Sequence, residues 1–316
     1  MFCLNLKSYD PFFNLAVEEI LLKNSEEEYL ILGVNDPCVV IGKHQSGHRE
    51  VNTKFVNEHH IPVIRRITGG GTVFHDRGNL NFSFIRRSES GKQVDFRKYT
   101  KPVIDFLASL GVEARFEGKN DLRVDGYKVS GNAEHIFHNR VLHHGTLLLR
   151  CSLDTLRNSI RKDTSKYTSR AVPSNPSSVM NLYEMMNRIE DISEFKRLMI
   201  NYFLKSNTGY ILYDLTREVT QQAESLAESK YKSWEWNWAY GPEYQFSNSF
   251  EINGIIHSCR MLIKEGIITE CELEGSEKGR SISGKLKGCR HMAEDIYDLI
   301  RKENINLALE EVYNFF

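Results

Sequence analysis

Three consecutive glycines, Gly69–Gly71, restrict the fold of this chain more than any other feature of its sequence. They lie within Arg65–Asp76, shortly after two arginines. Glycine allows positive φ angles and brings backbone N–H groups close to a ligand, and successive N–H groups in such a bend form a concavity that fits phosphate. Neighbouring arginines can add bidentate contacts to an anion. The segment therefore predicts either an anion-binding loop or a tight hairpin with both arginines on a solvated face.

The glycine segment departs from the common nucleotide-binding patterns. It matches neither the G-x-x-x-x-G-K-[ST] phosphate loop nor the G-x-G-x-x-G dinucleotide fingerprint, so the folds built on those loops are disfavoured. The formal net charge is −1, from 41 Lys+Arg against 42 Asp+Glu. This balance gives no global field toward nucleic acid or membrane, and we expect neither as a partner. An anionic ligand must therefore be held by a local site.

A second segment whose residues could bind a ligand is Asn120–Asn132. It contains the Asp125-Gly126 pair that is typical of a hairpin turn. Lys128 then begins the returning strand, across from the region of Asp121. A lysine on a strand is held firmly enough to place its ammonium on a phosphate or carboxylate oxygen where negative charge develops; a solvated strand lysine is the alternative. Asp121 could hold Mg²⁺, orient the lysine or form a turn.

A third segment, His143–Gly145, precedes the apolar run Thr146–Leu149. Two adjacent histidines on a strand point to opposite faces, so we expect one in the core and one facing a ligand. His135 and His138 make a metal cluster conceivable, but no acid or cysteine completes it. Gly145, at the entrance of a strand, indicates close approach of another backbone or a ligand.

Periodicity and turn residues indicate both helices and strands. Asp10 is a good N-cap for a helix that begins at Pro11. Strand-like runs follow at Tyr29–Leu32 and Cys38–Ile41. From Ser152 to about Lys232 the pattern is mostly helical. We therefore expect a large α+β unit of mixed sheets with packed helices.

A domain boundary is predicted near Trp234–Pro242, where three tryptophans stand close together. Beyond it, two alternating runs predict strands, and a helix from about Met292 to Arg301 closes the chain. We expect a catalytic domain over residues 1–240 and a small C-terminal α/β accessory domain over residues 241–316.

Apolar runs, the N-terminal residues and the cysteines indicate where in the cell the protein works. No stretch reaches the roughly 18 consecutive apolar residues that a membrane span needs, and the N-terminal residues do not form a signal peptide. The 6 cysteines show no paired spacing, which is typical of reduced thiols. A cytoplasmic location is expected.

In their order, the three segments resemble the lipoate–protein ligase A family: Arg-Arg-x-x-Gly-Gly-Gly-x-Val-Phe-His-Asp, then Asn-Asp-Leu with Lys-Val-Ser-Gly-x-Ala, then His-His-Gly-Thr-Leu-Leu-Leu. Phe13–Glu19 and Val39–Gln45 are similar to further family landmarks. The resemblance runs from near the N-terminus to about Tyr183, and the C-terminal unit resembles the accessory domain of the family more loosely. It implies a biotin/lipoate ligase-like catalytic fold.

The resemblance also implies a site for ATP, Mg²⁺ and lipoate. Lys128 is the expected catalytic residue, in contact with lipoate and the α-phosphate, and Asp121 the expected Mg²⁺ ligand. His44-Gln45 departs from the usual arginine-containing loop, and Thr72 replaces the commoner alanine. The expected substrate- and ATP-binding residues are Arg66, Gly71, Thr72, Val73, Phe74, Asp121, Lys128, His144 and Gly145.

The function implied is formation of lipoyl-AMP and transfer of its lipoyl group to a lysine. The expected acceptors are lipoyl domains of the acyltransferase (E2) subunits of 2-oxoacid dehydrogenases and the glycine cleavage H protein. Two alternatives stay open: an octanoyl- or lipoyl-transferase of the same fold that uses a cysteine thioester, and a non-catalytic lipoate-binding protein. Phe116–Asp121, where one class of relatives carries its cysteine, has no thiol, and Cys151 is the nearest one.

Overall fold

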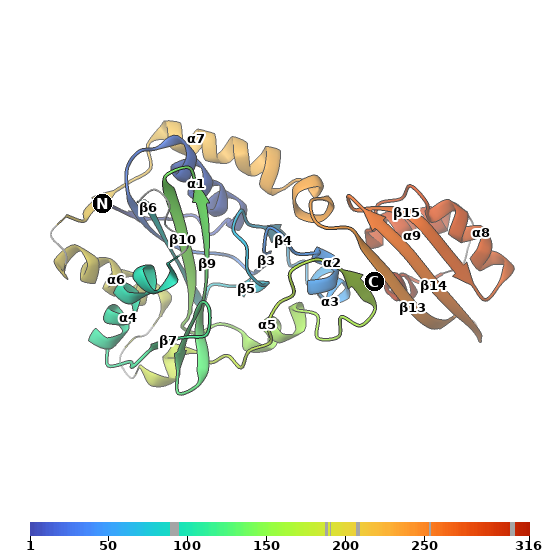
Figure 1. Ribbon diagram of the computed structural model, residues 1–316, viewed down its shortest axis with the longest axis horizontal. Helices are drawn as coiled ribbons and strands as arrows, with labels where there is room; N and C mark the ends of the chain where they lie inside the picture. Colours follow the sequence, from blue (N-terminus) through green and yellow to red (C-terminus); the bar gives the residue numbers. More distant parts are fainter. Residues whose placement is uncertain (89–94, 187–188, 190, 207–208, 253, 304–306) are drawn as a thin grey trace. The chain divides into compact units, whose positions relative to one another are not determined.

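The computed structural model describes residues 1–88, 95–186, 189, 191–206, 209–252, 254–303 and 307–316 (Figure 1). They form two compact units, each drawn from three separated parts of the chain. The first unit consists of Met1–Lys43, Pro62–Arg157 and Asn175–Lys232, and the second of His44–Ile61, Asn158–Ser174 and Ser233–Phe316. The compact units thus divide the chain differently from the predicted boundary at residue 240. The catalytic and accessory roles predicted for 1–240 and 241–316 remain predictions.

The first unit is built on an eight-stranded sheet, in which β9 and β10 are the long green strands of Figure 1. The pairs β12–β1 and β1–β2 are parallel, and the remaining neighbours are antiparallel. The order across the sheet is β12 (Ile211–Tyr213), β1 (Phe2–Asn5), β2 (Tyr29–Val34), β6 (Asn79–Arg87), β10 (Arg140–Leu148), β9 (Tyr127–Phe137), β8 (Asp121–Val124) and β7 (Arg115–Glu117).

The main hydrophobic core lies on one face of this sheet. There α4 (Phe96–Ser109) and α6 (Ile192–Ser206) contribute Phe106, Phe195 and Phe203, which join Phe82 and Phe84 of β6 in the core. Successive strand side chains point to opposite faces, so the residues between them face the other side. That other face carries the residues of the candidate site.

Helix α1 (Pro11–Asn24) lies against the second face and begins where the sequence predicts. Oδ1 of Asp10 accepts the N–H of Phe12 at 2.8 Å, which satisfies a free helix N-terminal donor. Alongside α1 run α7 (Arg217–Leu226) and the π-helical turn η2 (Ala227–Tyr231). A nearly buried Glu19 on α1 pairs with Lys230 at 2.7 Å and ties η2 to the helix.

A three-stranded sheet completes the first unit and confirms the strand predicted at Cys38–Ile41. Its order is β4 (Val63–Arg65), β3 (Cys38–Ile41) and β5 (Val73–His75), with β3 parallel to β4 and antiparallel to β5. The glycines Gly69–Gly71 connect β4 to β5. The chain also forms α5 (Leu153–Ser159) and a 3-10 turn, η1 (Leu182–Met185).

The second unit is an antiparallel sheet with helices on one face. Phe246, Met261 and Leu273 alternate with exposed polar residues along the strands and pack against Ile282 and Ile296 of the helices. The strand order is β11 (Tyr167–Ser169), β13 (Tyr244–Ile252), β14 (Ile255–Lys264) and β15 (Ile267–Glu274). The helical elements are α2 (Gly47–Glu50), α3 (Thr53–Glu58), the π-helical turn η3 (Glu235–Ala239), α8 (Glu277–Leu286), α9 (Ala293–Lys302), α10 (Leu309–Val312) and the 3-10 turn η4 (Tyr313–Phe315).

Two strands correct the prediction of a mostly helical region from residue 152 to 232. β11 and β12 lie in it, and each pairs with a strand that is distant in sequence. A three-residue strand is too short to show alternation, so local sequence did not reveal either one. The predicted strands after the boundary and the closing helix are confirmed by β13, β14 and α9. No helix in the described ranges is long and apolar enough to cross a bilayer.

Two buried histidines of the second unit lie in contact, with their rings tilted relative to each other. The rings of His48 and His291 are 4.7 Å apart, and His291 stacks on Phe316 at 4.5 Å. Nε2 of His291 donates to the carbonyl oxygen of Phe315 at 2.7 Å, so Nδ1 accepts from the hydroxyl of Tyr244 at 2.6 Å. Burial lowers the pKa of His291 to about 4 and that of His48 well below its usual value. The unit is therefore built around neutral imidazoles.

Acid should destabilise the second unit through His291. The unfolded imidazole titrates near 6.5, so between about pH 6.5 and 4 the unfolded chain binds the extra proton and stability falls by up to about 1.4 kcal/mol per pH unit. In His291→Gln this proton is absent, and we expect a shallower loss of unfolding free energy over that range. Tryptophan fluorescence in urea reports it, because all 3 tryptophans (Trp234, Trp236, Trp238) lie in this unit. Equal pH slopes in variant and parent would contradict the assignment.

Candidate active site

One face of the eight-stranded sheet carries a row of polar and small residues, which we call the site floor. The register aligns Ser83 of β6 with His144 of β10, and His144 with Ala133 of β9. On β9, Gly131 lies two residues from Ala133 and pairs with Asp121 of β8. In β6 and β10 these residues alternate with core residues, so they face away from the main core. Four strands thus contribute to one surface.

The glycine segment lies over the site floor. Oγ1 of Thr68 is 2.7 Å from Nε2 of His144. A Cβ atom placed on Gly70 would lie 3.7 Å from Cβ of Ala133, and Gly70 has a φ of 89°, which favours glycine. The loop between β4 and β5 therefore contacts both β10 and β9.

Arg66 holds this loop in shape. Its Nη2 donates to the carbonyl oxygens of Gly69 at 2.6 Å and Gly71 at 2.8 Å, its Nη1 to that of Val40 at 3.1 Å, and its Nε to Oγ1 of Thr68 at 2.9 Å. Burial lowers the pKa of Arg66 to about 10, and Glu18 acts in the opposite direction. The carbonyl oxygens of the loop point toward the guanidinium, so hydrogen bonds from Arg66 fix the conformation of the predicted anion-binding loop.

The alternative of a hairpin with solvated arginines is wrong. Arg65 is 0% and Arg66 5% exposed. Nη1 of Arg65 donates to the carbonyl oxygens of Gly42 at 3.0 Å and Lys43 at 3.1 Å. A buried guanidinium needs such acceptors because an unpaired buried charge is costly. Both arginines are therefore structural parts of the loop.

His144 belongs to a chain of hydrogen bonds. Oγ1 of Thr68 accepts from Nε of Arg66 and lies 2.7 Å from Nε2 of His144. Nδ1–H of His144 donates to Oε2 of Glu18 at 2.9 Å, and the hydroxyl of Ser83 donates to the other oxygen of Glu18. The chain links the loop, the sheet and α1. It also fixes the tautomer of His144.

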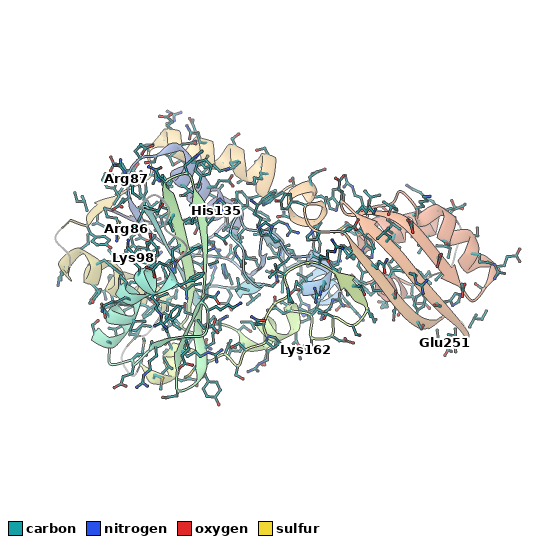
Figure 2. All side chains as sticks on the ribbon, in the orientation of Figure 1. Arg86, Arg87, Lys98, His135, Lys162 and Glu251 are labelled. Carbon is teal, nitrogen blue, oxygen red and sulfur yellow. The ribbon has the colours of Figure 1, made fainter. Side chains whose placement is uncertain are left out.

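One of the two adjacent histidines was predicted to lie in the core, and this part of the prediction is confirmed. His143 is fully buried and lies 2.8 Å from Glu134, and burial lowers its pKa. His144 is on the site floor and is partly exposed. His135, labelled in Figure 2, follows Ala133 by two residues on β9, and its pKa is lowered by burial and then by Lys43. That His144 contacts a ligand stays a prediction.

A β-bulge places Lys128 above the site floor. Leu122 pairs with Ser130, but Arg123 pairs with Lys128, so Val129 is an extra residue in β9. Val129 is fully buried. The predicted hairpin across from the Asp121 region is thereby confirmed, with a bulge that the sequence did not reveal.

The ammonium of Lys128 lies over Gly131. A Cβ atom on Gly131 would be 3.0 Å from both Cε and Nζ of the lysine, so only glycine leaves the side chain this path. Gly131 and Ala133 are roughly 7 Å apart along β9, and Ala133 lies beneath Gly70. The ammonium and the glycine loop therefore share one face of one strand.

Asp121 holds the lysine by an ion pair. Its Oδ1 is 2.7 Å from Nζ of Lys128, and its Oδ2 is 2.9 Å from Nη2 of Arg123. Both oxygens thus contact cations. Within the described residues no group of three or more His, Cys, Asp or Glu could hold a metal ion. The arrangement favours an orienting role for Asp121 over its predicted role as a Mg²⁺ ligand.

Two of the predicted binding residues face elsewhere. The side chain of Phe74 is 2% exposed in the core, so only its backbone could meet a ligand. Gly145 lies inside β10, where a Cβ atom would be 2.5 Å from Cζ of Phe82 and closer still to Oδ1 of Asn132. The close approach on the Cβ side of Gly145 is to side chains, and the expected contact of Gly145 with a ligand stays a prediction. Thr72 is buried and Val73 partly buried on the loop side.

Glu18 and Ser83 are site residues that sequence reasoning missed. A signal for Glu18 was present, because it stands three residues after Leu15 and four before Leu22 on the buried side of α1. A carboxylate at such a position needs a polar partner. Ser83 offered no signal, since a serine in a strand is unremarkable by itself.

A family model, the lipoyl protein ligase A/B catalytic domain, matches residues 10–204. Lipoate–protein ligase 1 of Staphylococcus aureus is 35% identical over 302 residues, which cover 94% of this chain and 92% of the relative. The chain belongs to the lipoyl protein ligase A/B family.

Solved structures agree with this assignment. A lipoate–protein ligase A bound with ATP is 25% identical with a TM-score of 0.64, over 74% of this chain and 97% of that one. Protein Ta0514 of T. acidophilum with bound lipoic acid is 25% identical with a TM-score of 0.63, over 74% of this chain and 98% of that one. The predicted family and the predicted α+β fold are confirmed.

Gly145→Ala should destabilise the first unit without any ligand being involved. The new methyl group would overlap Phe82 and Asn132, and overpacking of this kind costs about 1–3 kcal/mol of unfolding free energy. Urea unfolding followed by circular dichroism measures the loss. Gly69→Ala is the matched control, because no atom lies within 4 Å of its Cβ position. Equal stability of the two variants would show that Gly145 is not a packing residue.

Proposed function

We propose that this chain is an ATP-dependent lipoate–protein ligase that forms lipoyl-AMP and transfers the lipoyl group to a lysine of an acceptor protein. The observation that carries the proposal is the ammonium of Lys128, held above Gly131 on the face of β9 that the glycine loop covers. Family membership and the ATP and lipoic acid bound to two similar structures support it. The acyl-adenylate would lie between the loop and the lysine.

In the first step a carboxylate oxygen of lipoate attacks the α-phosphorus of ATP in line. A carboxyl oxygen–phosphorus bond forms, the α–β phosphate bond breaks, and pyrophosphate leaves. Lys128 neutralises negative charge on the α-phosphate oxygens as it develops. Asp121 keeps the ammonium in place. Mg²⁺ would arrive as part of the MgATP substrate, held mainly by phosphate oxygens.

In the second step the neutral amine of an acceptor lysine attacks the acyl carbonyl of lipoyl-AMP. A carbon–nitrogen bond forms, the bond from carbonyl carbon to phosphate oxygen breaks, AMP leaves, and the amine loses a proton. The acceptors are lipoyl domains of E2 subunits and the glycine cleavage H protein. No nucleophile of the enzyme is required, because the mixed anhydride is already activated.

The geometry around Cys151 argues against a thioester mechanism. Cys151 is 4% exposed, and burial raises the pKa of its thiol, which disfavours the thiolate. Its backbone N–H and carbonyl are both bonded to the side chain of Asn181 at 2.9 Å. The residue behaves as a packed, inert thiol.

Lys128→Ala should abolish formation of lipoyl-AMP. The variant lacks the charge that offsets the developing phosphate charge, and removal of one such preorganised group costs roughly 100- to 1,000-fold. Pyrophosphate release from lipoate and MgATP measures the step. Lys101→Ala removes an equal charge from the exposed face of α4, where Lys101 pairs with Asp105, and should leave the rate unchanged.

Gly131→Ala tests whether the position of the Lys128 ammonium matters, because this variant keeps the charge and moves it. The added methyl would displace the flexible end of Lys128, so we expect near-normal stability and a pyrophosphate rate reduced by about tenfold or more. Near-normal rates in both Lys128→Ala and Gly131→Ala would rule out the proposed site.

Cys151→Ala should keep full ligase activity. The ligase mechanism needs no thiol, whereas a transferase would lose its covalent intermediate. Mass spectrometry of a recombinant lipoyl domain after incubation with lipoate and MgATP measures the product. Loss of lipoylation in a variant that folds normally would favour the transferase alternative, and no pyrophosphate release from the parent protein would favour a passive binder.

A further inference from the structure

A chain of side-chain amides beside the site fixes the orientation of one histidine. Nδ2 of Asn14 on α1 donates to the carbonyl oxygens of Ser8 at 3.0 Å and Val34 at 3.4 Å, and to Oδ1 of Asn35 at 2.8 Å. Carbonyl oxygens only accept, so the amide nitrogen of Asn14 is assigned without ambiguity. Oδ1 of Asn35 must then accept, and its Nδ2 donates to Nδ1 of His75 at 3.1 Å.

His75 therefore carries its proton on Nε2. Nδ1 accepts from Asn35, and a neutral imidazole has one donor and one acceptor. Burial, with smaller contributions from the nearby Arg66 and His144, lowers the pKa of His75 to about 3. The ring is thus neutral and presents an Nε2–H donor.

That donor has no protein partner among the described residues. Nε2 of His75 is buried and unbonded, and the residue is 7% exposed. A buried donor without an acceptor costs about 1–3 kcal/mol, so native proteins rarely keep one without a reason. His75 shares a face of β5 with Val73, opposite the core residue Phe74.

The surroundings favour an anionic oxygen as the missing partner. The two groups that act on the ring are the guanidinium of Arg66, just after β4, and the imidazole of His144 on β10. Glu18 is the acid of this cluster, and its two oxygens already accept from His144 and Ser83. The Nε2–H therefore lies near a buried guanidinium, and each oxygen of the carboxylate in this cluster already accepts a hydrogen bond.

We propose that Nε2–H of His75 donates a hydrogen bond to an anionic oxygen of the bound substrate, a lipoate carboxylate or an ATP phosphate, and that Asn35 is the positioning residue that keeps this proton on Nε2. The inference rests on the proposed function, because that function supplies both anions. His75 binds and orients its ligand and does not transfer a proton, since the ring is neutral and holds its proton throughout the working pH range.

Nitrogen NMR of isotope-labelled histidine tests the assignment directly. In the free protein the His75 ring should be neutral with its proton on Nε2. Lipoate alone and α,β-methylene ATP alone are added in separate samples, and the one that shifts the Nε2–H resonance supplies the oxygen. A proton on Nδ1 in the free protein, or no shift with either ligand, would overturn the proposal and leave a buried water as the partner.

Matched variants measure the contribution to binding by calorimetry with the same two ligands. His75→Phe keeps a ring without a donor and should weaken binding of the identified ligand about tenfold or more. His75→Gln keeps a donor near the Nε2 position and should recover part of the affinity. His257→Phe is the control, a 5% exposed histidine of the second unit whose Nε2 already contacts Ser276 at 3.0 Å; it should leave binding unchanged.

Asn35→Asp tests the positioning role. A carboxylate at residue 35 can only accept, so it should draw the proton to Nδ1 and weaken binding as much as His75→Phe does. Equal affinity of the parent, His75→Phe and Asn35→Asp for both ligands would refute the inference while the ligase proposal stands. A parent protein that binds neither lipoate nor the ATP analogue would refute both.

Discussion

A positive charge cut off from water holds the candidate site together. The guanidinium of Arg66 is buried, and it is stable there only because the carbonyls of Val40, Gly69 and Gly71 and the hydroxyl of Thr68 accept its protons. Those acceptors belong to a strand and to the loop itself, so the charge and the loop conformation require each other. A lysine could not satisfy four acceptors in this fixed planar geometry. The loop is therefore shaped by desolvation before any ligand arrives.

The sheet below supplies the second half of the site through its register. The glycine loop packs over Ala133 of β9, and the side chain of Lys128 packs over Gly131 of the same strand. Both residues are small, and the neighbouring strands carry polar residues at the paired positions. The bulge at Val129 decides on which face Lys128 emerges, since one extra residue reverses the side-chain direction. Packing of the opposite face against α4 and α6 keeps this register fixed. The position of the Lys128 ammonium thus depends on the hydrophobic core on the opposite face of the sheet, because that core fixes the strand register.

Local chemistry made part of this site predictable. The Asp10 cap, the Asp125-Gly126 turn and the opposite faces of His143 and His144 follow from residue type and spacing, and the turn residues have the expected positive φ of 50° and 80°. Burial of Arg65 and Arg66, the packing role of Gly145 and the pairing of both Asp121 oxygens depend on segments far apart in sequence, so no local pattern showed them. The amide chain that ends at His75 joins α1, β2 and β5 and is visible only after folding. Long-range contacts, which local sequence does not encode, account for most of the errors.

The second unit is assembled from three separated stretches of chain, and this has a consequence for how the protein is made. β11, at residues 167–169, pairs with β13, which begins at Tyr244. A ribosome emits the chain from the N-terminus at about 5–20 residues per second, so this strand and the residues 44–61 wait several seconds for their partners. During that interval the intervening segment 175–232 can already complete the first sheet by adding β12 beside β1. Biosynthesis therefore favours an order in which the first unit folds before the second, whose strand β13 is made later.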